Sequence, residues 1–266
     1  MARIAVAATA PFGANVLERL AARHDVAALV TRRDRPQGRG RRVAPPPAKL
    51  VAARLGVPVL QPERLDASFV PPAETVVVVA YGVLIPAVAL ERALWLNVHP
   101  SLLPRWRGAA PVERAIMAGD EETGVSVHQT VEELDAGPVA ATARFEIGLD
   151  DTAGDVYERA AAVTPELVDA ALAARAEFVP QPEAGATYAE KIGPADRELD
   201  WSRPAKELHD RIRAVSPHIG ARGELHGRRV TVWRSRLTDD GELELLEVQP
   251  EGRRRMTYDE FLRGLR

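Results

Sequence analysis

The chain has 266 residues, of which 46% are hydrophobic and 27% charged, and its formal net charge is -3. These values are ordinary for a globular protein that buries one large core or two smaller ones. There is no cysteine, which excludes disulfides, a thiolate nucleophile and cysteine-ligated zinc. The apolar run at residues 3–8 is too short for a signal peptide or a membrane span, so we expect a cytoplasmic protein.

The first 31 residues predict the opening of an α/β fold. Apolar runs at residues 3–8 and 25–31 predict buried strands, and the amphipathic stretch 14–23 predicts a helix between them. The turn after the first strand has one glycine and one proline, so it lacks the three-glycine fingerprint of a dinucleotide site. We therefore expect no nicotinamide or flavin cofactor, and we expect no bound metal.

Six arginines and one aspartate fall between residues 32 and 42, together with glycines and a proline. This composition predicts an exposed loop. One interpretation is a solvated linker. The other is a contact for a polyanion, because an otherwise acidic chain concentrates positive charge here, and flexible glycines would let guanidinium groups reach several phosphates.

From residue 49 to about 178, predicted helices alternate with predicted strands, as in a mostly parallel sheet covered by helices. The unbroken β-branched run at 75–81 is typical of a strand that is covered on both faces. The long final helix should be capped by Asp151 and Thr152. The predicted helices are 49–55, 111–118 and 153–178, and the predicted strands are 57–60, 75–81, 96–99, 124–130 and 138–147.

Two polar side chains stand at the end of one predicted strand. Asn97 and His99 share a strand face, and Pro100 ends the strand because it has no N–H to donate. Ligands bind at the carboxyl ends of strands in open α/β sheets. Asp135, in the loop after strand 124–130, could complete the group and would favour the charged form of His99. His128, within that strand, we interpret as structural.

An amide, a histidine and a carboxylate, with no nucleophilic serine or cysteine motif nearby, suit acyl transfer between two bound substrates. The amide and the imidazolium would hold the oxyanion of a tetrahedral intermediate, while the histidine and the carboxylate manage protons. For a single Asn-x-His, the alternative is a capped strand end with a hydrogen-bonded histidine.

Three segments closely resemble the formyltransferase family that uses 10-formyltetrahydrofolate: NVHPSLLPRWRGAAP at residues 97–111, TGVSV at 123–127 and LDAG at 134–137. The resemblance implies an α/β, Rossmann-like fold and 10-formyltetrahydrofolate as the formyl donor. It also implies a set of residues that bind this cosubstrate. The pterin ring would lie against Tyr81, Gly82, Val83, Leu84 and Ile85, and the folate and formyl site would be shaped by Ser101, Leu102, Leu103 and Pro104.

Both ends of the chain resemble the members of this family whose acceptor is initiator methionyl-tRNA. The arginine-rich stretch is similar to the insertion with which those members grip the acceptor arm of the tRNA. This similarity implies phosphate contacts by Arg33, Arg35, Arg39, Arg41 and Arg42. Further similarity at 186–192, 200–205 and 212–217 extends the resemblance over nearly the full chain. We expect a monomer with no membrane contact.

The resemblance also predicts the domain organisation. A formyltransferase catalytic domain would cover residues 1–178, a linker 179–200, and a small OB-like β-barrel domain 201–266. Only about 45 residues remain for the barrel from Gly220 onward, so we expect a reduced barrel. Its predicted elements are strands at 227–236 and 242–248 and a helix at 257–265.

Three alternatives stay open. Within the family, an N-formyltransferase acting on an amino-sugar nucleotide would share the Asn, His and Asp, although a small anionic sugar does not require the arginine-rich stretch. A formyltetrahydrofolate hydrolase would use water in place of the amine. From another class, a non-catalytic RNA-binding relative is conceivable because the C-terminal domain is short, but intact Asn97, His99 and Asp135 argue against it.

Overall fold

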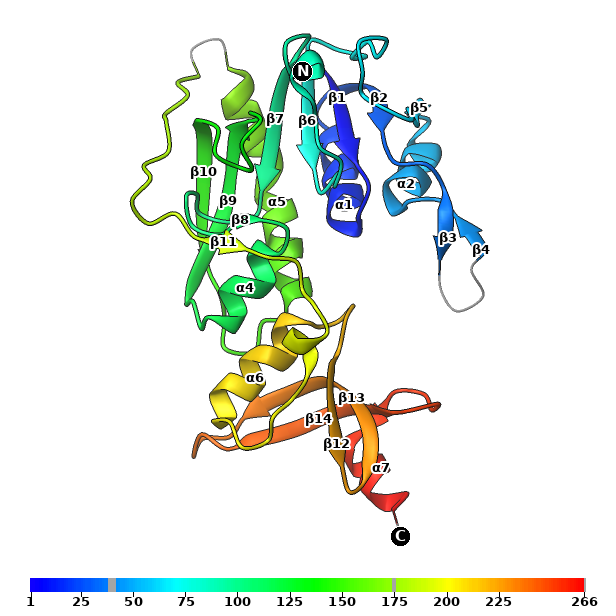
Figure 1. Cartoon of the computed structure of the whole chain (residues 1–266), viewed down its shortest axis with the longest axis vertical. Helices are drawn as coiled ribbons and strands as arrows, with labels where there is room; N and C mark the ends of the chain where they lie inside the picture. The colour runs from blue at the N-terminus through cyan, green and yellow to red at the C-terminus, as the bar shows by residue number, and fades with distance from the viewer. Residues whose placement is uncertain (38–41, 174–175, 266) are drawn as a thin grey trace. The chain divides into compact units, whose positions relative to one another are not determined.

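The computed structural model describes residues 1–37, 42–173 and 176–265 (Figure 1). The chain divides into two compact units, each assembled from separate stretches of sequence. The first unit comprises Met1–Arg107, Gly124–Arg144 and Glu158–Thr187, and the second comprises Gly108–Thr123, Phe145–Tyr157 and Tyr188–Arg266. The chain therefore passes several times between the units.

Within the described residues, seven strands form the main sheet, in the order β10-β9-β7-β6-β1-β2-β5. The β6–β7, β1–β6, β1–β2 and β2–β5 pairs are parallel, and the β7–β9 pair is antiparallel. The predicted mostly parallel sheet is thus confirmed. The strands are β1 (Arg3–Ala8), β2 (Asp25–Val30), β5 (Val59–Leu60), β6 (Thr75–Val79), β7 (Leu94–His99), β9 (Glu122–Gln129) and β10 (Val139–Glu146).

Helices α1 (Pro11–Ala21) and α2 (Pro47–Leu55) contact each other and the sheet. Both helices have proline in the first turn, where a backbone N–H would have no intrahelical acceptor, so its absence costs no hydrogen bond. The single glycine of the first turn has a packing role: a Cβ on Gly13 would lie 2.5 Å from the carbonyl oxygen of Val79. This close approach of helix to strand explains why glycine is required at this position.

Helix α5 (Ala153–Leu172) lies beside α1. Its Glu158 accepts hydrogen bonds from Asn15 and Arg19 of α1. The helix ends at Leu172, so the prediction that it runs to about residue 178 is wrong. Val179 instead forms two backbone hydrogen bonds with Val139, at 2.8 and 2.9 Å. Val179 thus forms an isolated antiparallel bridge to the first residue of β10, which apolar periodicity alone does not indicate.

The arginine-rich stretch, predicted as a loop, contains a hairpin (Figure 1). Strands β3 (Arg35–Gln37) and β4 (Arg42–Ala44) pair antiparallel. Charged composition indicated a loop, but an exposed hairpin also leaves its side chains in water. Its base is held by Lys49, whose Nζ donates to both carboxylate oxygens of Asp34 at 2.8 Å and to Gln61 Oε1 at 2.9 Å. Residues 38–41 lie outside the described residues.

In the described part of the second unit, four antiparallel strands lie in the order β12-β13-β14-β15. Helix α6 contacts α4 and β13, and α7 contacts β14. The antiparallel C-terminal sheet is as predicted, but the sequence analysis missed α6 and β12, treating them as connecting structure. The elements are α4 (Pro111–Met117), a 3-10 turn (Ala195–Arg197), α6 (Ala205–Ala214), β12 (Ala221–Leu225), β13 (Arg228–Leu237), β14 (Leu243–Pro250), β15 (Met256–Thr257) and α7 (Tyr258–Arg263).

Three short elements complete the chain: α3 (Ala87–Leu90), β8 (Arg107–Gly108) and β11 (Tyr188–Ala189). Among the described helices, none has the length and apolar character needed to cross a bilayer. Within the same residues, no group of three histidine or acidic side chains is placed to hold a metal ion.

Candidate active site

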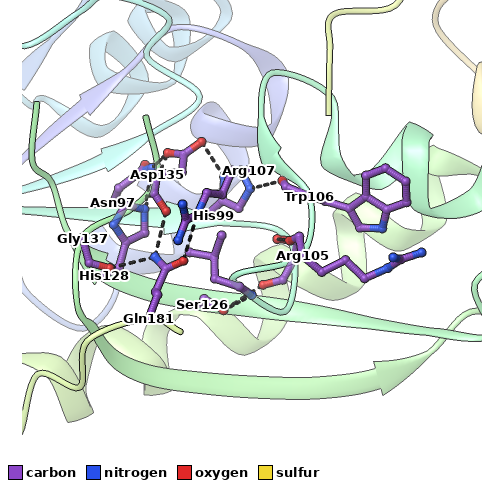
Figure 2. A network of polar contacts seen from close by, with 12 residues as sticks. Asn97, His99, Arg105, Trp106, Arg107, Ser126, His128, Asp135, Gly137 and Gln181 are labelled. Carbon is purple, nitrogen blue, oxygen red and sulfur yellow. Dashed lines mark hydrogen bonds and ion pairs between the residues drawn. The ribbon is translucent and has the colours of Figure 1, made fainter. Parts of the chain in front are cut away.

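Asn97 and His99, from the end of β7, converge with His128 of β9 on the side chain of Asp135 (Figure 2). Asn97 Nδ2 donates to Asp135 Oδ1 at 2.9 Å. His99 Nδ1 lies 3.6 Å from Asp135 Oδ2, and His128 Nε2 lies 3.6 Å from Asp135 Oδ1. The structure thus brings together the three residues that the sequence analysis selected, and it adds His128.

The position of His128 follows from strand pairing. In the β7–β9 ladder, Asn97 is directly opposite His128. His128 Nδ1 lies 2.9 Å from the carbonyl oxygen of Gln129, so this nitrogen carries the proton, because a carbonyl only accepts. Nε2 is then an acceptor, and it receives the second amide hydrogen of Asn97 at 3.1 Å. Both hydrogens of the Asn97 amide are therefore committed, one to Asp135 and one to His128.

The same reasoning fixes the protonation of His99. Its Nε2 lies 2.7 Å from the carbonyl oxygen of Trp106 and so carries a hydrogen. The titrating nitrogen is Nδ1, which faces Asp135. Burial lowers the pKa of His99 below its usual value, and the attraction of Asp135 only partly offsets this effect. Asp135 favours the charged form of His99, as expected, but burial has the larger effect. The pKa therefore lies below its usual value, and the ring that was expected as an imidazolium is neutral near pH 7.

Asp135 has an unusual backbone. Its φ of 50° lies in the left-handed region, which is uncommon for a residue other than glycine. Two residues later, a Cβ on Gly137 would lie 1.8 Å from the carbonyl oxygen of Gln129. Only glycine fits there. The loop is thus pressed against the end of β9, and this close approach helps to direct the carboxylate of Asp135 toward β7.

The loop after β7 is organised by two buried serines. Ser126 of β9 donates to the carbonyl oxygen of Ser101 at 2.8 Å and accepts from the backbone N–H of Leu103 at 3.2 Å. Ser101 in turn donates to the carbonyl oxygen of Arg105 at 2.7 Å. The side chain of Ser101 is inaccessible to solvent, so it acts on the loop rather than on a ligand. Leu102, Leu103 and Pro104 are partly exposed.

The segment predicted to hold the pterin divides into buried and exposed positions. Tyr81 and Ile85 belong to the core of the first unit, packed among residues such as Trp95. Between them, Val83 is 39% exposed and Leu84 80% exposed. Gly82 has a φ of 67°, which allows the chain to turn outward. An apolar, exposed tip on a buried base is a suitable surface for a flat ring.

The structure describes only some of the arginines that were predicted to contact tRNA. Arg33, Arg35 and Arg42 are exposed, whereas Arg39 and Arg41 lie outside the described residues. Arg33 and Arg35 line a cavity of about 450 Å³ that also reaches the pterin segment. Its lining includes Arg32, Arg33, Arg35, Glu63, Arg64, Tyr81, Gly82 and Val83. Two groups of residues that the sequence analysis assigned to different ligands therefore border the same space.

Sequence reasoning missed two further residues beside the cluster (Figure 2). Gln181 Nε2 donates to the carbonyl oxygens of Asp135 and Gly137, both at 2.8 Å. Arg107 Nε donates to Gln181 Oε1 at 3.1 Å. The only sequence signal was the position of Arg107 within the 97–111 motif. Gln181 lies in the proline-rich stretch predicted as a linker, where nothing indicated a contact with the site.

Residues 2–172 match the family described as formyl transferase, and residues 191–241 match the family described as the formyl transferase C-terminal domain. The chain belongs to the formyl transferase family.

The curated relatives carry a more specific name. The chain is 41% identical to a methionyl-tRNA formyltransferase of Cereibacter sphaeroides, over 98% of this chain and 96% of the relative. It is 42% identical to that of Paracoccus denitrificans, over 99% of this chain and 97% of the relative. With the enzyme of Xanthomonas axonopodis pv. citri the identity is 44%, over 94% and 84% respectively.

Solved structures share the fold at low sequence identity. A methionyl-tRNA formyltransferase from Clostridium thermocellum matches with a TM-score of 0.64 and 16% identity, over 94% of this chain and 99% of that one. HypX from Aquifex aeolicus, crystallised with tetrahydrofolic acid, matches with a TM-score of 0.69 and 16% identity. That match covers 98% of this chain but only 46% of HypX. At these identities the matches describe the fold alone.

Proposed function

We propose that this protein transfers the formyl group of 10-formyltetrahydrofolate to the α-amino group of initiator methionyl-tRNA, in translation initiation in the cytoplasm. The observation that carries the proposal is the convergence of Asn97 and His99 with Asp135 at the carboxyl end of β7. The curated relatives, which match over nearly their full length, support these substrates.

The reaction sets two demands on the site. The amine attacks the formyl carbon as the free base, which is partly populated at neutral pH because an α-amino group has a pKa of roughly 8. A C–N bond forms and the carbonyl oxygen becomes an oxyanion. When the intermediate collapses, the bond from the formyl carbon to the folate nitrogen breaks; that nitrogen gains a proton, and the attacking amine loses one. The protein must hold the oxyanion and manage these protons.

His99 and Asp135 are suited to accept and stabilise the proton that the attacking amine loses. Neutral His99 has a free lone pair on Nδ1, since Nε2–H is held by the carbonyl of Trp106. A proton taken up at Nδ1 would be stabilised by Asp135 Oδ2, 3.6 Å away. Asn97 is the candidate for the oxyanion. Because both of its amide hydrogens are committed, binding an oxyanion requires Asn97 to exchange its bond to Asp135 or to His128 for one to substrate.

The exposed tip of the pterin segment supports the choice of cosubstrate. Val83 and Leu84 offer apolar surface beside the outward turn at Gly82, and we propose that the ring packs there. Tyr81 and Ile85 hold this tip in the core. The loop of Ser101, Leu102, Leu103 and Pro104 would shape the formyl end of the site. 10-Formyltetrahydrofolate supplies the activated formyl group when bound.

We propose that the arginine-rich stretch binds the acceptor arm of the tRNA through Arg33, Arg35, Arg39, Arg41 and Arg42. Their guanidinium groups match phosphate geometry. We further propose that the protein acts as a monomer, with a catalytic domain at 1–178, a linker at 179–200 and a reduced OB-like domain at 201–266. Chromatography with light scattering measures the mass in solution, and a dimer would contradict the monomer.

The purified protein would be tested for transfer of radiolabelled formyl from 10-formyltetrahydrofolate. Three reactions run in parallel, with methionyl-tRNA, with an amino-sugar nucleotide, and with no acceptor. We expect label on the tRNA alone, with a rate that falls steeply as salt is added. Label on the sugar nucleotide alone would replace the proposed acceptor. Loss of formyl without any acceptor would indicate a hydrolase.

A further inference from the structure

Gln181 occupies a position in the first unit that its sequence context does not suggest. It lies between two prolines, in the stretch predicted as a linker. Its side-chain amide nevertheless reaches the loop that carries Asp135, 46 residues away in sequence. A single side chain from a distant segment therefore contacts the backbone of the residue that we place at the centre of the chemistry.

The contact is a clamp in which both hydrogens and the oxygen of the amide form hydrogen bonds. The two hydrogens on Nε2 go to the carbonyl oxygens of Asp135 and Gly137, each at 2.8 Å. The oxygen of the amide accepts from Arg107 Nε at 3.1 Å. The reverse orientation would place Oε1 against two carbonyl oxygens, so the orientation of Gln181 is fixed. The clamp joins residues on both sides of Ala136, and so it fixes the left-handed turn at Asp135.

Arg107 supports the clamp through its hydrogen bond to Gln181. Its side chain is 1% exposed, and its Nη1 and Nη2 have no hydrogen-bond partner among the described residues. The carboxylates of Glu133 and Glu183 lie 3.9 Å from these two nitrogens, on side chains that are 68% and 84% exposed. The buried guanidinium thus makes its directional hydrogen bond to Gln181, while two solvated glutamates balance its charge.

We infer that Gln181 is a positioning residue for formyl transfer: supported by Arg107, it holds the backbone of Asp135 so that the carboxylate faces His99 and Asn97. This inference rests on the proposed function, through the role of Asp135. It makes the stretch around residue 181 part of the active site. Loosening the clamp lets the carboxylate drift from His99 Nδ1, and misplacement of a reacting group by about 1 Å costs up to a hundredfold in rate.

The test compares Gln181→Ala and Gln181→Glu with the wild-type protein in the transfer assay. In Gln181→Glu the shape is kept, but the donors that face the two carbonyls are lost. We expect kcat to fall by about tenfold to a hundredfold in both variants. The KM for 10-formyltetrahydrofolate should stay unchanged, because Gln181 contacts only protein groups. Wild-type kcat in Gln181→Glu, or a loss confined to KM, would overturn the inference.

A double-mutant cycle separates positioning from general damage. If Gln181 acts only through Asp135, adding Gln181→Ala to Asp135→Ala costs nothing further. If the two losses multiply, the inference is wrong. Arg92→Ala is the matched control: it removes one side-chain hydrogen bond to a backbone carbonyl, that of Phe69 at 2.9 Å, and should keep wild-type kcat. An inactive wild-type protein would instead count against the proposed function.

Discussion

The cluster around Asp135 and the arginine hairpin belong to the same unit but are built in opposite ways. In the cluster, the two histidines are buried, with His99 4% exposed and His128 1% exposed, and Asn97 and Asp135 are partly buried. Each of these side chains makes polar contacts to defined partners. On the hairpin and just before it, Arg33, Arg35 and Arg42 are exposed to solvent. The Arg33 ion pair with Glu63 spans 3.4 Å between side chains that are 59% and 75% exposed. Exposed pairs of this kind contribute little to stability.

This difference separates two kinds of recognition. Groups held in a low-dielectric site interact strongly with developing charge, so the cluster is suited to stabilise a transition state once Asn97 has exchanged one hydrogen bond for one to the substrate. Solvated arginines keep their charge available over a distance and adapt to a flexible polyanion, but salt screens them. We therefore expect substitutions in the cluster to lower kcat, and substitutions on the hairpin to raise KM in a salt-dependent way.

The largest effect is expected from Asn97→Ala. The variant removes the candidate oxyanion donor and leaves Asp135 and His128 without the amide between them. Loss of such a donor costs on the order of a hundredfold or more in turnover. Single-turnover transfer measures the chemical step, and circular dichroism tests whether the fold is intact. Near-normal turnover would remove Asn97 from the mechanism and weaken the contrast between the two regions.

The sequence predicted features that depend on neighbouring residues, and it missed contacts between residues that are far apart in the chain. Asn97 and His99 could be placed at a strand end because proline ends a ladder locally. His128 could not be placed opposite Asn97, because sequence does not state which strands pair. Gln181 was missed because its contact spans 46 residues. The charge of His99 was predicted wrongly because burial, a property of the folded chain, outweighs the nearby carboxylate.

On the hairpin the sequence predicted exposure correctly and secondary structure wrongly. Glycine, proline and charge indicate solvent contact, but they do not distinguish a loop from a two-stranded hairpin. What orders the base is a long-range network: Gln61 Nε2 donates to Asp34 Oδ1 at 2.8 Å and to the carbonyl oxygen of Arg32 at 2.6 Å. Lys49 holds the pKa of Asp34 below its usual value by hydrogen bonding to it. The arginines are thus carried on a fixed base.

A smaller effect is expected from the double variant Arg35→Ala and Arg42→Ala. Loss of two phosphate contacts should raise the KM for methionyl-tRNA several-fold and reduce the slope of log KM against log salt by about two, with kcat unchanged. Arg3→Ala is the control, because Arg3 is exposed and paired with Asp25 at 2.7 Å, away from the hairpin in sequence.

The same variants decide what the shared cavity binds. Arg35 borders it together with Gly82 and Val83, so the KM for 10-formyltetrahydrofolate is measured alongside that for tRNA. A rise in the folate KM with an unchanged tRNA KM would reassign Arg35 to the cosubstrate. It would also contradict the proposed contrast, in which the cluster around Asp135 carries the chemistry and the arginine hairpin binds only the tRNA.

The smallest effect is expected from pH. Burial holds the pKa of His99 below the value of about 6.5 that it has in an unfolded chain. The unfolded state therefore binds this proton at a higher pH than the folded state does. The contribution of His99 to stability is fully present above about pH 6.5 and is lost as the pH falls through the folded pKa. For turnover, neutral His99 is the form that accepts the proton, so its protonation should lower kcat only as the pH falls through its folded pKa, which lies below 6.5. Protonation of the acceptor amine, whose pKa is roughly 8, lowers the rate from a higher pH and is the same for every variant.

His99→Gln tests the consequence for stability. Urea unfolding of the wild-type protein and of the variant would be compared at pH 7.5 and pH 5.5. Buried His24, whose pKa is also lowered chiefly by burial, contributes equally to both proteins and cancels in the difference. We expect the wild-type protein to lose more stability than the variant on acidification. A larger loss in the variant would mean that His99 is charged when folded, and the assignment of Nδ1 as the proton acceptor would then fail.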